Sequence, residues 1–359
     1  MIRVVFFVFD PSPRIDRRIR EFKENGYDVE VYGLANDFNI KYCTNDVYTY
    51  NLIANMRAGM PYKERASHIK EILKIIDEKK DKKTVFYFFT INVAVATLFR
   101  RIKYIYEESD MLFDRFSNKL LQKTVILINK RIIKRSLQTV FTSEGFADYY
   151  YGDRFPSNIS FITNRVSPKC LELTDKVKEK VDFRHLKLGF VGNIRYQSIL
   201  NVSDVVSEQT DFEFHYFGND ESLSPDQKQH FKMPGVYMHG GFSNPDDLPS
   251  IYSTLDFVVC TYDVKGVNPR YAEPNKLYEA IYYRTPMIVS AGSFLAKKVE
   301  RLGIGISLDP NDKIDIKAKI DSLSEVQYNK MVERLNEIPR ESAVNVNTLF
   351  FNKMKDLLS

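Results

Sequence analysis

The chain has 359 residues, of which 44% are hydrophobic and 28% charged, and this ordinary composition suits a globular protein of two domains. Its formal net charge of +5 fits an anionic substrate or membrane surface, but it is too small to indicate binding of nucleic acid. The cysteines Cys43, Cys170 and Cys260 are far apart and form no C-x-x-C pair. The sequence therefore argues against a disulfide framework or a zinc site and favours a reducing compartment.

The first residues have the pattern of a buried strand and not of a signal peptide. The run 4–9 is apolar without a break, and Asp10 and two prolines follow it. The longest apolar stretch, 85–99, is interrupted by Thr90 and Asn92 and is shorter than the ~18–20 residues that span a bilayer. We therefore expect a cytoplasmic protein without a transmembrane helix.

Strands and helices are predicted to alternate along the first half. Ser12 can cap a helix, Pro13 fits its first position, and Gly26 ends it before a second strand at 28–33. Such a strand–helix–strand unit implies a parallel sheet. Further strands are expected at 47–53, 84–89, 103–107, 139–142 and 159–162, and helices at 62–80, 92–101 and 118–135. A loop is expected at 143–145, and a polar linker at 172–184.

The pattern then starts again. Strands are expected at 186–191, 212–217, 236–239, 257–260 and 287–290, with helices at 247–254, 276–283, 294–302 and 344–358. The sequence thus predicts an α/β protein of two doubly wound parallel-sheet domains, residues 1–178 and 179–340. Residues 341–359 are expected to form a helix that returns to the first domain.

Several blocks resemble, in order and spacing, the GT-B fold glycosyltransferases, in particular the retaining glycosyltransferase family 4 (glycosyl transferases group 1). The blocks are SPRIDRRIREFKENGYDVEVYG, FITNRVSP, GFVGNIRY, HYFGND, YMHGGFSNPDDLPSIYSTLDFVVCTY and NPRYAEPNKLYEAIYYRTPMIVS. The resemblance covers most of the chain. The PNKLYEA form of the last block is similar to enzymes that build bacterial capsule, O-antigen and related surface polysaccharides.

This resemblance implies that the second domain binds a nucleotide-sugar donor. The sequence has no Asp-x-Asp motif, so basic side chains and a helix N-terminus are expected to stabilise the diphosphate without a metal. Glu279 is expected to accept hydrogen bonds from the ribose hydroxyls, although a capping role is the plainer alternative. Lys276 is either a phosphate ligand or a solvated lysine. The full donor set is Gly192, Asn193, Arg195, Gly218, Gly240, Phe242, Asn275, Lys276, Leu277 and Glu279.

One position departs from the family pattern, which has two glutamates separated by seven residues. The place before Glu279 is occupied by Tyr271, and Glu273 is nearby but out of register. The role of the first glutamate at the donor sugar is therefore in doubt here. We expect Arg270 and Glu273 to shape the sugar pocket instead.

In the first domain, Asp10, Ser12 and Arg14 follow the first strand and are candidates for contacts with the acceptor or donor. Glu108 and Asp110 are candidate catalytic carboxylates, with a solvated acidic turn as the alternative. The helix at 119–135 is basic and amphipathic. It is either a core helix with a basic outer face or a peripheral contact with an anionic membrane.

The sequence and this resemblance together predict a metal-independent hexosyltransferase that uses a UDP- or GDP-sugar and acts on a glycan or polyprenyl-linked acceptor. Retention of the anomeric configuration is implied by the resemblance to the family. No cofactor is implied, because the nucleotide-sugar is a substrate. A UDP-sugar 2-epimerase of the same fold and a non-catalytic nucleotide-sugar-binding subunit are the alternatives. A periplasmic binding protein also has two such domains, but we expect no signal peptide.

Overall fold

The computed structural model describes residues 1–9, 11–36, 47–55, 62–178 and 180–358. It divides into two compact units. The first unit comprises Met1–Thr142, Phe146–Ile162 and Asn347–Ser359, and the second comprises Ser143–Gly145 and Thr163–Val346. The polar stretch 172–184, expected to be a linker, thus falls within the second unit.

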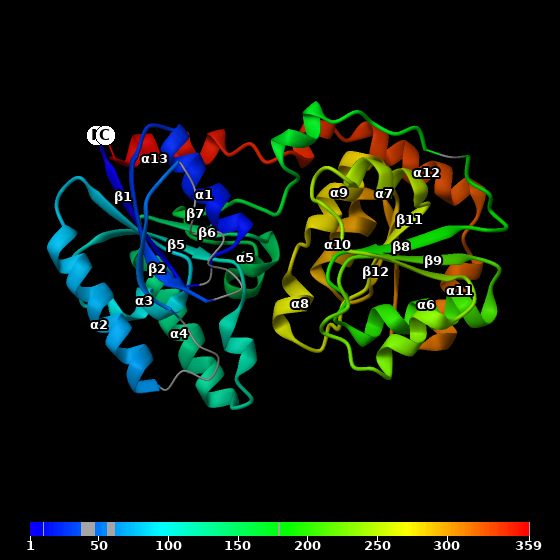
Figure 1. Cartoon of the computed structure of the whole chain (residues 1–359), viewed down its shortest axis with the longest axis horizontal. Coiled ribbons are helices and arrows are strands. Elements are labelled where there is room, and N and C mark those ends of the chain that lie inside the picture. Colours follow the sequence, from blue (N-terminus) through cyan, green and yellow to red (C-terminus); the bar gives the residue numbers. More distant parts are fainter. Residues whose placement is uncertain (10, 37–46, 56–61, 179, 359) are drawn as a thin grey trace. The chain divides into compact units, whose positions relative to one another are not determined.

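The first unit is built on a parallel sheet of seven strands in the order β3-β2-β1-β4-β5-β6-β7 (Figure 1). The strands are β1 (Arg3–Val8), β2 (Asp28–Ala35), β3 (Tyr50–Asn55), β4 (Thr84–Phe88), β5 (Lys103–Glu108), β6 (Gln138–Phe141) and β7 (Ile159–Phe161). Successive strands are added toward one edge of the sheet from β1 to β3 and toward the other edge from β4 to β7, so the strand order reverses between β1 and β4. Ligands of such sheets bind at the carboxyl ends of the strands where this reversal occurs.

The helices of this unit connect its strands, and the last one comes from the far end of the chain (Figure 1). They are α1 (Pro13–Glu24), α2 (Tyr62–Lys79), α3 (Ile91–Ala96), α4 (Lys119–Arg135), α5 (Glu144–Tyr151) and α13 (Thr348–Leu358), with a short 3₁₀ helix at Leu112–Arg115. Helix α1 begins and ends as predicted. Ser12 is its N-cap residue, although its side chain makes no capping bond, and Gly26 has a φ of 84° just beyond its last turn.

Aromatic rings fill the core of the first unit around Phe22, which is fully buried. Its ring centroid lies between 5.0 and 5.9 Å from those of five other rings, which belong to Phe6, Tyr27, Tyr87, Phe350 and Phe351. Two of these rings come from α13, so the C-terminal helix packs on the first unit through direct aromatic contacts.

The second unit is built on a parallel sheet of six strands in the order β10-β9-β8-β11-β12-β13. The strands are β8 (Lys187–Val191), β9 (Glu213–Phe217), β10 (Val236–Gly240), β11 (Phe257–Cys260), β12 (Met287–Ser290) and β13 (Gly305–Leu308). Its helices are α6 (Gln197–Gln209), α7 (Leu248–Thr254), α8 (Val267–Tyr271), α9 (Asn275–Tyr283), α10 (Phe294–Leu302), α11 (Lys313–Asp321) and α12 (Glu325–Glu337), with 3₁₀ helices at Pro168–Glu172, Gln227–Lys232 and Arg340–Ala343. The strand order reverses between β8 and β11.

The two doubly wound sheets confirm the predicted α/β class, but several elements were not predicted. These are α6, α8, α11, α12 and β13 in the second unit, and α5, whose first residue Glu144 lies in a predicted loop. The predicted third strand is shifted, because β3 begins at Tyr50. None of the helices within the described ranges combines the length and the apolar character needed to cross a membrane.

The aromatic core gives a direct test of how the first unit is held together. We expect Phe22→Ala to lower the free energy of unfolding by about 3–5 kcal/mol, because it removes a fully buried ring and leaves a cavity. The matched control is Phe99→Ala, whose side chain is 96% exposed and should have almost no effect. Urea unfolding followed by circular dichroism measures both. Equal losses in the two variants would contradict the packing described here.

Candidate functional site

Three glycines lie at the carboxyl ends of the strands β8, β9 and β10, at one edge of the second sheet: Gly192 and Gly218 follow β8 and β9, and Gly240 is the last residue of β10. Gly192, Gly218 and Gly240 have φ values of 131°, 145° and 83°, which residues other than glycine rarely adopt. The N–H of Gly192 donates to the carbonyl of Phe217, and the N–H of Gly218 donates to that of Gly240, both at 2.7 Å. A Cβ atom on Gly218 would lie 1.9 Å from the carbonyl oxygen of Gly192. The backbone turns are therefore stacked against one another, and only glycine allows this approach.

Lys276 extends along this edge from the first turn of α9. Its side chain is buried, and its Nζ atom lies 4.3 Å from the centre of the Phe190 ring and donates to the hydroxyl of Tyr262 at 3.3 Å. A Cβ atom on Gly192 would come within 3.0 Å of this Nζ atom. Among the described residues Lys276 has no ion pair. Burial lowers the pKa of Lys276. The alternative of a solvated lysine at the helix start does not hold.

Glu279 lies one helical turn further along α9 and is also buried. The hydroxyl of Tyr252, from α7, donates to its Oε2 atom at 2.7 Å. Burial raises the pKa of Glu279, while the charge of Lys276 and the Tyr252 hydrogen bond act in the opposite direction. The carboxylate is thus held in place by a neutral donor and has no salt-bridge partner within 4.0 Å in the described part of the chain.

Arg195 is exposed in the segment between β8 and α6, and its guanidinium carbon lies 5.0 Å from the centre of the Tyr196 ring. The Tyr196 ring in turn packs 4.8 Å from that of Tyr262, the hydrogen-bond partner of Lys276. The charge of Arg195 contributes to the lowered pKa of Lys276, after burial. The structure therefore places these two cations close together on one edge of the second sheet.

The other donor candidates in this unit lie at the same strand and helix ends, with different exposure. Asn193 and Asn275 are exposed, and Phe242 is partly buried against the core. Leu277 is fully buried, and its N–H already donates to the carbonyl of Pro274 at 3.1 Å. Only the two N–H groups before it, at the start of α9, have no partner within the helix.

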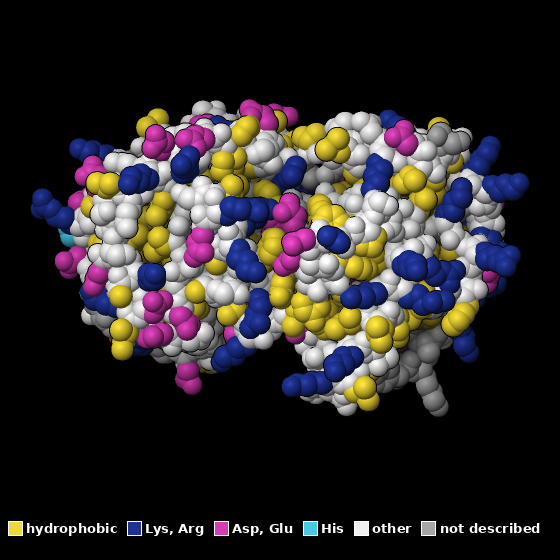
Figure 2. Space-filling view, turned by 180° about the vertical axis from the view of Figure 1, so that it is seen from behind, with side chains coloured by type: hydrophobic (Ala, Val, Ile, Leu, Met, Phe, Trp, Pro, Cys, Tyr) yellow, Lys and Arg dark blue, Asp and Glu magenta, His cyan; other side chains and the backbone are white. Residues whose placement is uncertain are grey.

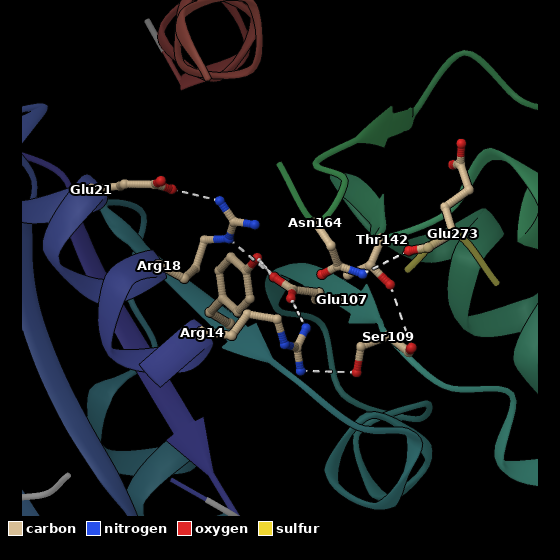
Figure 3. Close-up of polar contacts among 9 residues, drawn as sticks. Arg14, Arg18, Glu21, Glu107, Ser109, Thr142, Asn164 and Glu273 are labelled. Atoms are coloured by element: carbon tan, nitrogen blue, oxygen red, sulfur yellow. Dashed lines mark hydrogen bonds and ion pairs between the residues drawn. The ribbon is translucent and has the colours of Figure 1, made fainter. Parts of the chain in front are cut away.

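The two residues expected to shape the sugar pocket differ sharply. Arg270 is exposed, and its Nε donates to the carbonyl of Val264 at 3.0 Å. Glu273 is 1% exposed, and its carboxylate is paired with Lys298 and accepts a hydrogen bond from the N–H of Glu144 at 2.8 Å. Its carbonyl accepts from Asn164 at 3.0 Å, a contact drawn in Figure 3. This carboxylate is fully engaged by protein groups.

The first unit contains a cavity of about 470 Å³ at the carboxyl ends of β1, β4 and β5. This is the point where the strand order reverses. Its lining is polar over one part and apolar over another, and it includes Ser12, Arg14, Thr90, Asn92, Glu108, Asp110 and Arg115 together with Phe9, Ile15, Phe89 and Leu112. The hydroxyl oxygen of Thr90 is buried and has no hydrogen-bond partner in the described part of the first unit. Asp10, the other candidate after β1, lies outside the described residues.

Arg14 is not a freely available cation. Its guanidinium donates to Glu107 at 2.6 Å and to the Ser109 hydroxyl at 3.0 Å (Figure 3). Arg18, one turn further along α1, and Tyr87 bind the other oxygen of the same carboxylate. Although burial acts to raise it, the two arginines hold the pKa of Glu107 below its usual range. Arg14 therefore has a structural partner as well as a place in the cavity wall.

Glu108 and Asp110, the candidate catalytic carboxylates, have unlike surroundings. Glu108 is 3% exposed and accepts hydrogen bonds from the Asn129 amide at 2.7 and 2.8 Å and from the Tyr150 hydroxyl at 2.8 Å. Burial raises the pKa of Glu108 to about 8. The amide oxygen of Asn129 has no hydrogen-bond partner among the residues that the structure describes. If the amide group were rotated by 180°, a protonated Glu108 could donate a hydrogen bond to this oxygen. Asp110 is exposed at the cavity rim.

Several residues that shape these sites have no recognisable signal in the sequence. Tyr252, Phe190 and Tyr262 act on Glu279 and Lys276 but come from other elements of the second unit. Arg18 is the exception, because its spacing of four residues from Arg14 places both side chains on one face of a predicted helix. Within the described residues no three His, Cys, Asp or Glu side chains are grouped so that they could hold a metal ion. Metal independence stays a prediction.

Comparison of the fold with known structures identifies its class. The chain is similar to Alr3699/HepE from Anabaena, solved with UDP-glucose, at 12% identity and a TM-score of 0.69 over 99% of both chains. It is similar to WaaG, a glycosyltransferase involved in lipopolysaccharide biosynthesis, at 11% identity and 0.66 over 99% of both. A putative UDP-N-acetylglucosamine 2-epimerase from Listeria monocytogenes matches at 11% and 0.56, over 95% of this chain and 93% of that one. The protein has the GT-B fold.

Comparison with family models gives a more specific assignment for the second unit. Residues 175–342 match the model of the family described as glycosyl transferases group 1. The resemblance to this family is thereby confirmed for the part of the chain that carries Lys276 and Glu279. A search of the curated proteins finds no match to the sequence.

The neighbouring carboxylates Glu107 and Glu108 should shift stability with pH in opposite directions. The pKa of Glu108 rises from 4.5 to about 8 on folding, so its stabilising contribution is complete below pH 4.5 and is lost as the pH rises to about 8. At ~1.4 kcal/mol per pKa unit the loss amounts to a few kcal/mol. Glu108→Gln should remove this decline. The pKa of Glu107 is lowered, so its contribution is present at neutral pH and is lost as the pH falls.

Glu107→Gln is the matched comparison, because it changes the next residue of the same strand in the same way. It should cost about 3–5 kcal/mol at neutral pH, since it removes the buried carboxylate that pairs with both Arg14 and Arg18 and leaves Arg18 with Glu21 as its charge partner. Both predictions are tested by the urea concentration at the midpoint of unfolding, measured for each variant between pH 4.5 and about 8. A Glu108→Gln variant with the pH profile of the parent protein would contradict the assignment.

Proposed function

We propose that the protein is a glycosyltransferase that moves a sugar, a hexose by the family resemblance, from a UDP- or GDP-linked donor to a glycan or lipid-linked acceptor. The observation that carries this proposal is the buried ammonium group of Lys276 beside the Gly192 turn, which has no ion pair among the described residues. A buried cation without a partner destabilises the free protein, and an anionic ligand would compensate for it. The diphosphate of a nucleotide-sugar is such a ligand.

The donor would bind along the carboxyl edge of the second sheet. The Gly192 turn lets a phosphate approach the backbone, Lys276 and Arg195 would contribute positive charge, and the N-terminus of α9 would contribute its dipole. These groups would stabilise the charge that develops on the leaving diphosphate, which is the largest electrostatic demand of the reaction. Glu279, oriented by Tyr252, would accept hydrogen bonds from the ribose hydroxyls. The turn at Gly240 and the ring of Phe242 would contact the base.

Support for a UDP donor comes from the solved relatives, since Alr3699/HepE binds UDP-glucose. Retention of configuration follows from the resemblance to the family, and a surface polysaccharide as product follows from the PNKLYEA motif. The cavity of the first unit has hydroxyl, amide and carboxylate groups around an apolar wall, which suits a sugar acceptor. Asp110 is the carboxylate there that we would place near an acceptor hydroxyl.

The proposed donor site is tested by nucleotide binding. UDP or GDP at a hundredfold its dissociation constant should raise the stability of the protein by about 2.7 kcal/mol, while CMP should have little effect. Lys276→Met should weaken binding about 10- to 100-fold, because it removes a charge-assisted contact with the diphosphate. Lys330→Met, at an exposed site on α12, is the control. Thermal shift and titration calorimetry give both numbers. Equal affinity in the two variants would refute the diphosphate site.

The pH dependence of binding isolates the charge of Lys276. Because the pKa of Lys276 is lowered by burial, the free protein should lose this charge at a lower pH than an ordinary lysine does. Bound diphosphate favours the protonated form, so the affinity for UDP should fall as the pH rises above the lowered pKa. Lys276→Arg keeps its charge and should bind with a flatter profile. A decline that is the same in both proteins would show that another group titrates.

Activity assays separate transfer from the two alternatives. Slow hydrolysis of the donor sugar or its transfer to an acceptor, lost in Glu279→Ala and Arg195→Ala, supports the transferase. Incorporation of solvent deuterium at C2 of a UDP-sugar without acceptor would support the 2-epimerase, whose fold is similar. Binding of the nucleotide-sugar without any reaction would support a non-catalytic subunit.

A further inference from the structure

Helix α4 of the first unit carries an unusual excess of positive charge. Its 17 residues, KLLQKTVILINKRIIKR, contain six lysines and arginines and no acidic residue. None of these six has an ion pair with any residue that the structure describes. Two make other contacts: Lys130 lies 5.3 Å from the ring of Tyr151, and Arg135 donates to the carbonyl of Arg100. The remaining charges, on Lys119, Lys123, Arg131 and Lys134, are exposed.

The same helix also exposes large apolar side chains. Leu120 is 74% exposed, Leu127 is 68% exposed and Leu121 is 42% exposed, and Phe116, three residues before the helix, is 39% exposed. The inner face is defined by the buried residues Asn129, Ile132 and Ile133. Core packing therefore explains one face of α4 and leaves the leucines of the other face without a protein partner in the described structure.

The exposed leucines and the cations share one face. Leu120 and Leu127 are separated by seven residues, or two helical turns, and so lie one above the other. Lys123 falls between them, Arg131 is four residues beyond Leu127, and Lys134 is seven beyond it. The outer face of α4 thus carries two exposed leucines about 10 Å apart, flanked by positive charges, along a helix about 25 Å long at 1.5 Å per residue. In Figure 2 the first unit, at the right, displays many basic and hydrophobic side chains and few acidic ones.

We propose that the outer face of α4 binds the surface of a membrane that contains anionic lipids. A helix that lies in the interfacial region places apolar side chains among the acyl chains and its basic side chains near the headgroups. The exposed leucines distinguish this partner from nucleic acid, for which charge alone would suffice. Six like charges with no acidic residue oppose pairing of α4 with a second copy of itself. This inference does not depend on the proposed function.

The test is partition of the full chain onto vesicles of phosphatidylcholine, with or without phosphatidylglycerol, measured by sedimentation. We expect binding only to the anionic vesicles, weakened by high salt. Lys123→Gln with Arg131→Gln should reduce partition about 25-fold, at about fivefold for each charge near the surface. Leu120→Gln with Leu127→Gln should reduce it at least ~10-fold, because two leucines no longer enter the acyl region. Glutamine retains helix propensity, so α4 should still form.

Two control variants make the same kinds of substitution, of an exposed leucine and of exposed lysines, outside α4. Leu349→Gln alters a leucine of α13 that is 87% exposed, and Lys319→Gln with Lys330→Gln removes two exposed charges from the second unit. Both should bind vesicles as the parent does. All variants should retain the circular dichroism spectrum and nucleotide affinity of the parent, which separates this test from that of the donor site. The proposal is overturned by absence of binding, by equal binding to uncharged vesicles, or by equal losses in the controls.

Discussion

The burial of the Lys276 ammonium group, which has no carboxylate partner among the described residues, is the main electrostatic constraint on this edge of the second sheet. Lys276 is held between the ring of Phe190 and the backbone of Gly192, and its only polar contact in the described structure is a tyrosine hydroxyl. A hydroxyl and a ring face compensate only part of the hydration that the ammonium loses. The lowered pKa of Lys276 expresses this imbalance. Stability alone does not account for such a lysine, because an apolar side chain would fit the same space at lower cost.

In the first unit, by contrast, the buried carboxylates are compensated by partners within the protein. Glu107 is fully buried, yet Arg14, Arg18 and Tyr87 occupy both of its oxygens, so its charge is neutralised within the protein. Glu108 is also satisfied by hydrogen bonds, and its raised pKa favours the neutral form near pH 7. An anionic ligand would therefore find its most favourable electrostatic interactions in the second unit. The cavity of the first unit offers hydrogen bonds more than net charge, which agrees with a neutral, hydroxyl-rich ligand.

The sequence was sufficient for the class of fold, because buried parallel strands are nearly continuous apolar runs and their order follows from the alternation with helices. It failed for α6, whose segment QSILNVSDVVSEQ contains too many polar residues to be recognised as a packed helix. The structure explains this: Ser198 and Ser203 are buried because they bond to Thr261 and Tyr216, which are distant in sequence. Local periodicity cannot reveal such pairs. The same limit hid the partnership of Tyr252 with Glu279.

The structure bears on the departure at Tyr271, where the family pattern has a glutamate. The sequence left open that Glu273 replaces the missing carboxylate, but its oxygens are bound by Lys298 and the N–H of Glu144, and it is only 1% exposed. Turning this side chain toward a ligand would leave a backbone N–H unpaired in the interior and would leave Lys298 with only the half-exposed carboxylate of Glu144, at a cost of several kcal/mol. Glu273 therefore holds the segment before α9 in place. Of the two residues predicted to shape the sugar pocket, Arg270 in α8 is the one whose side chain is exposed.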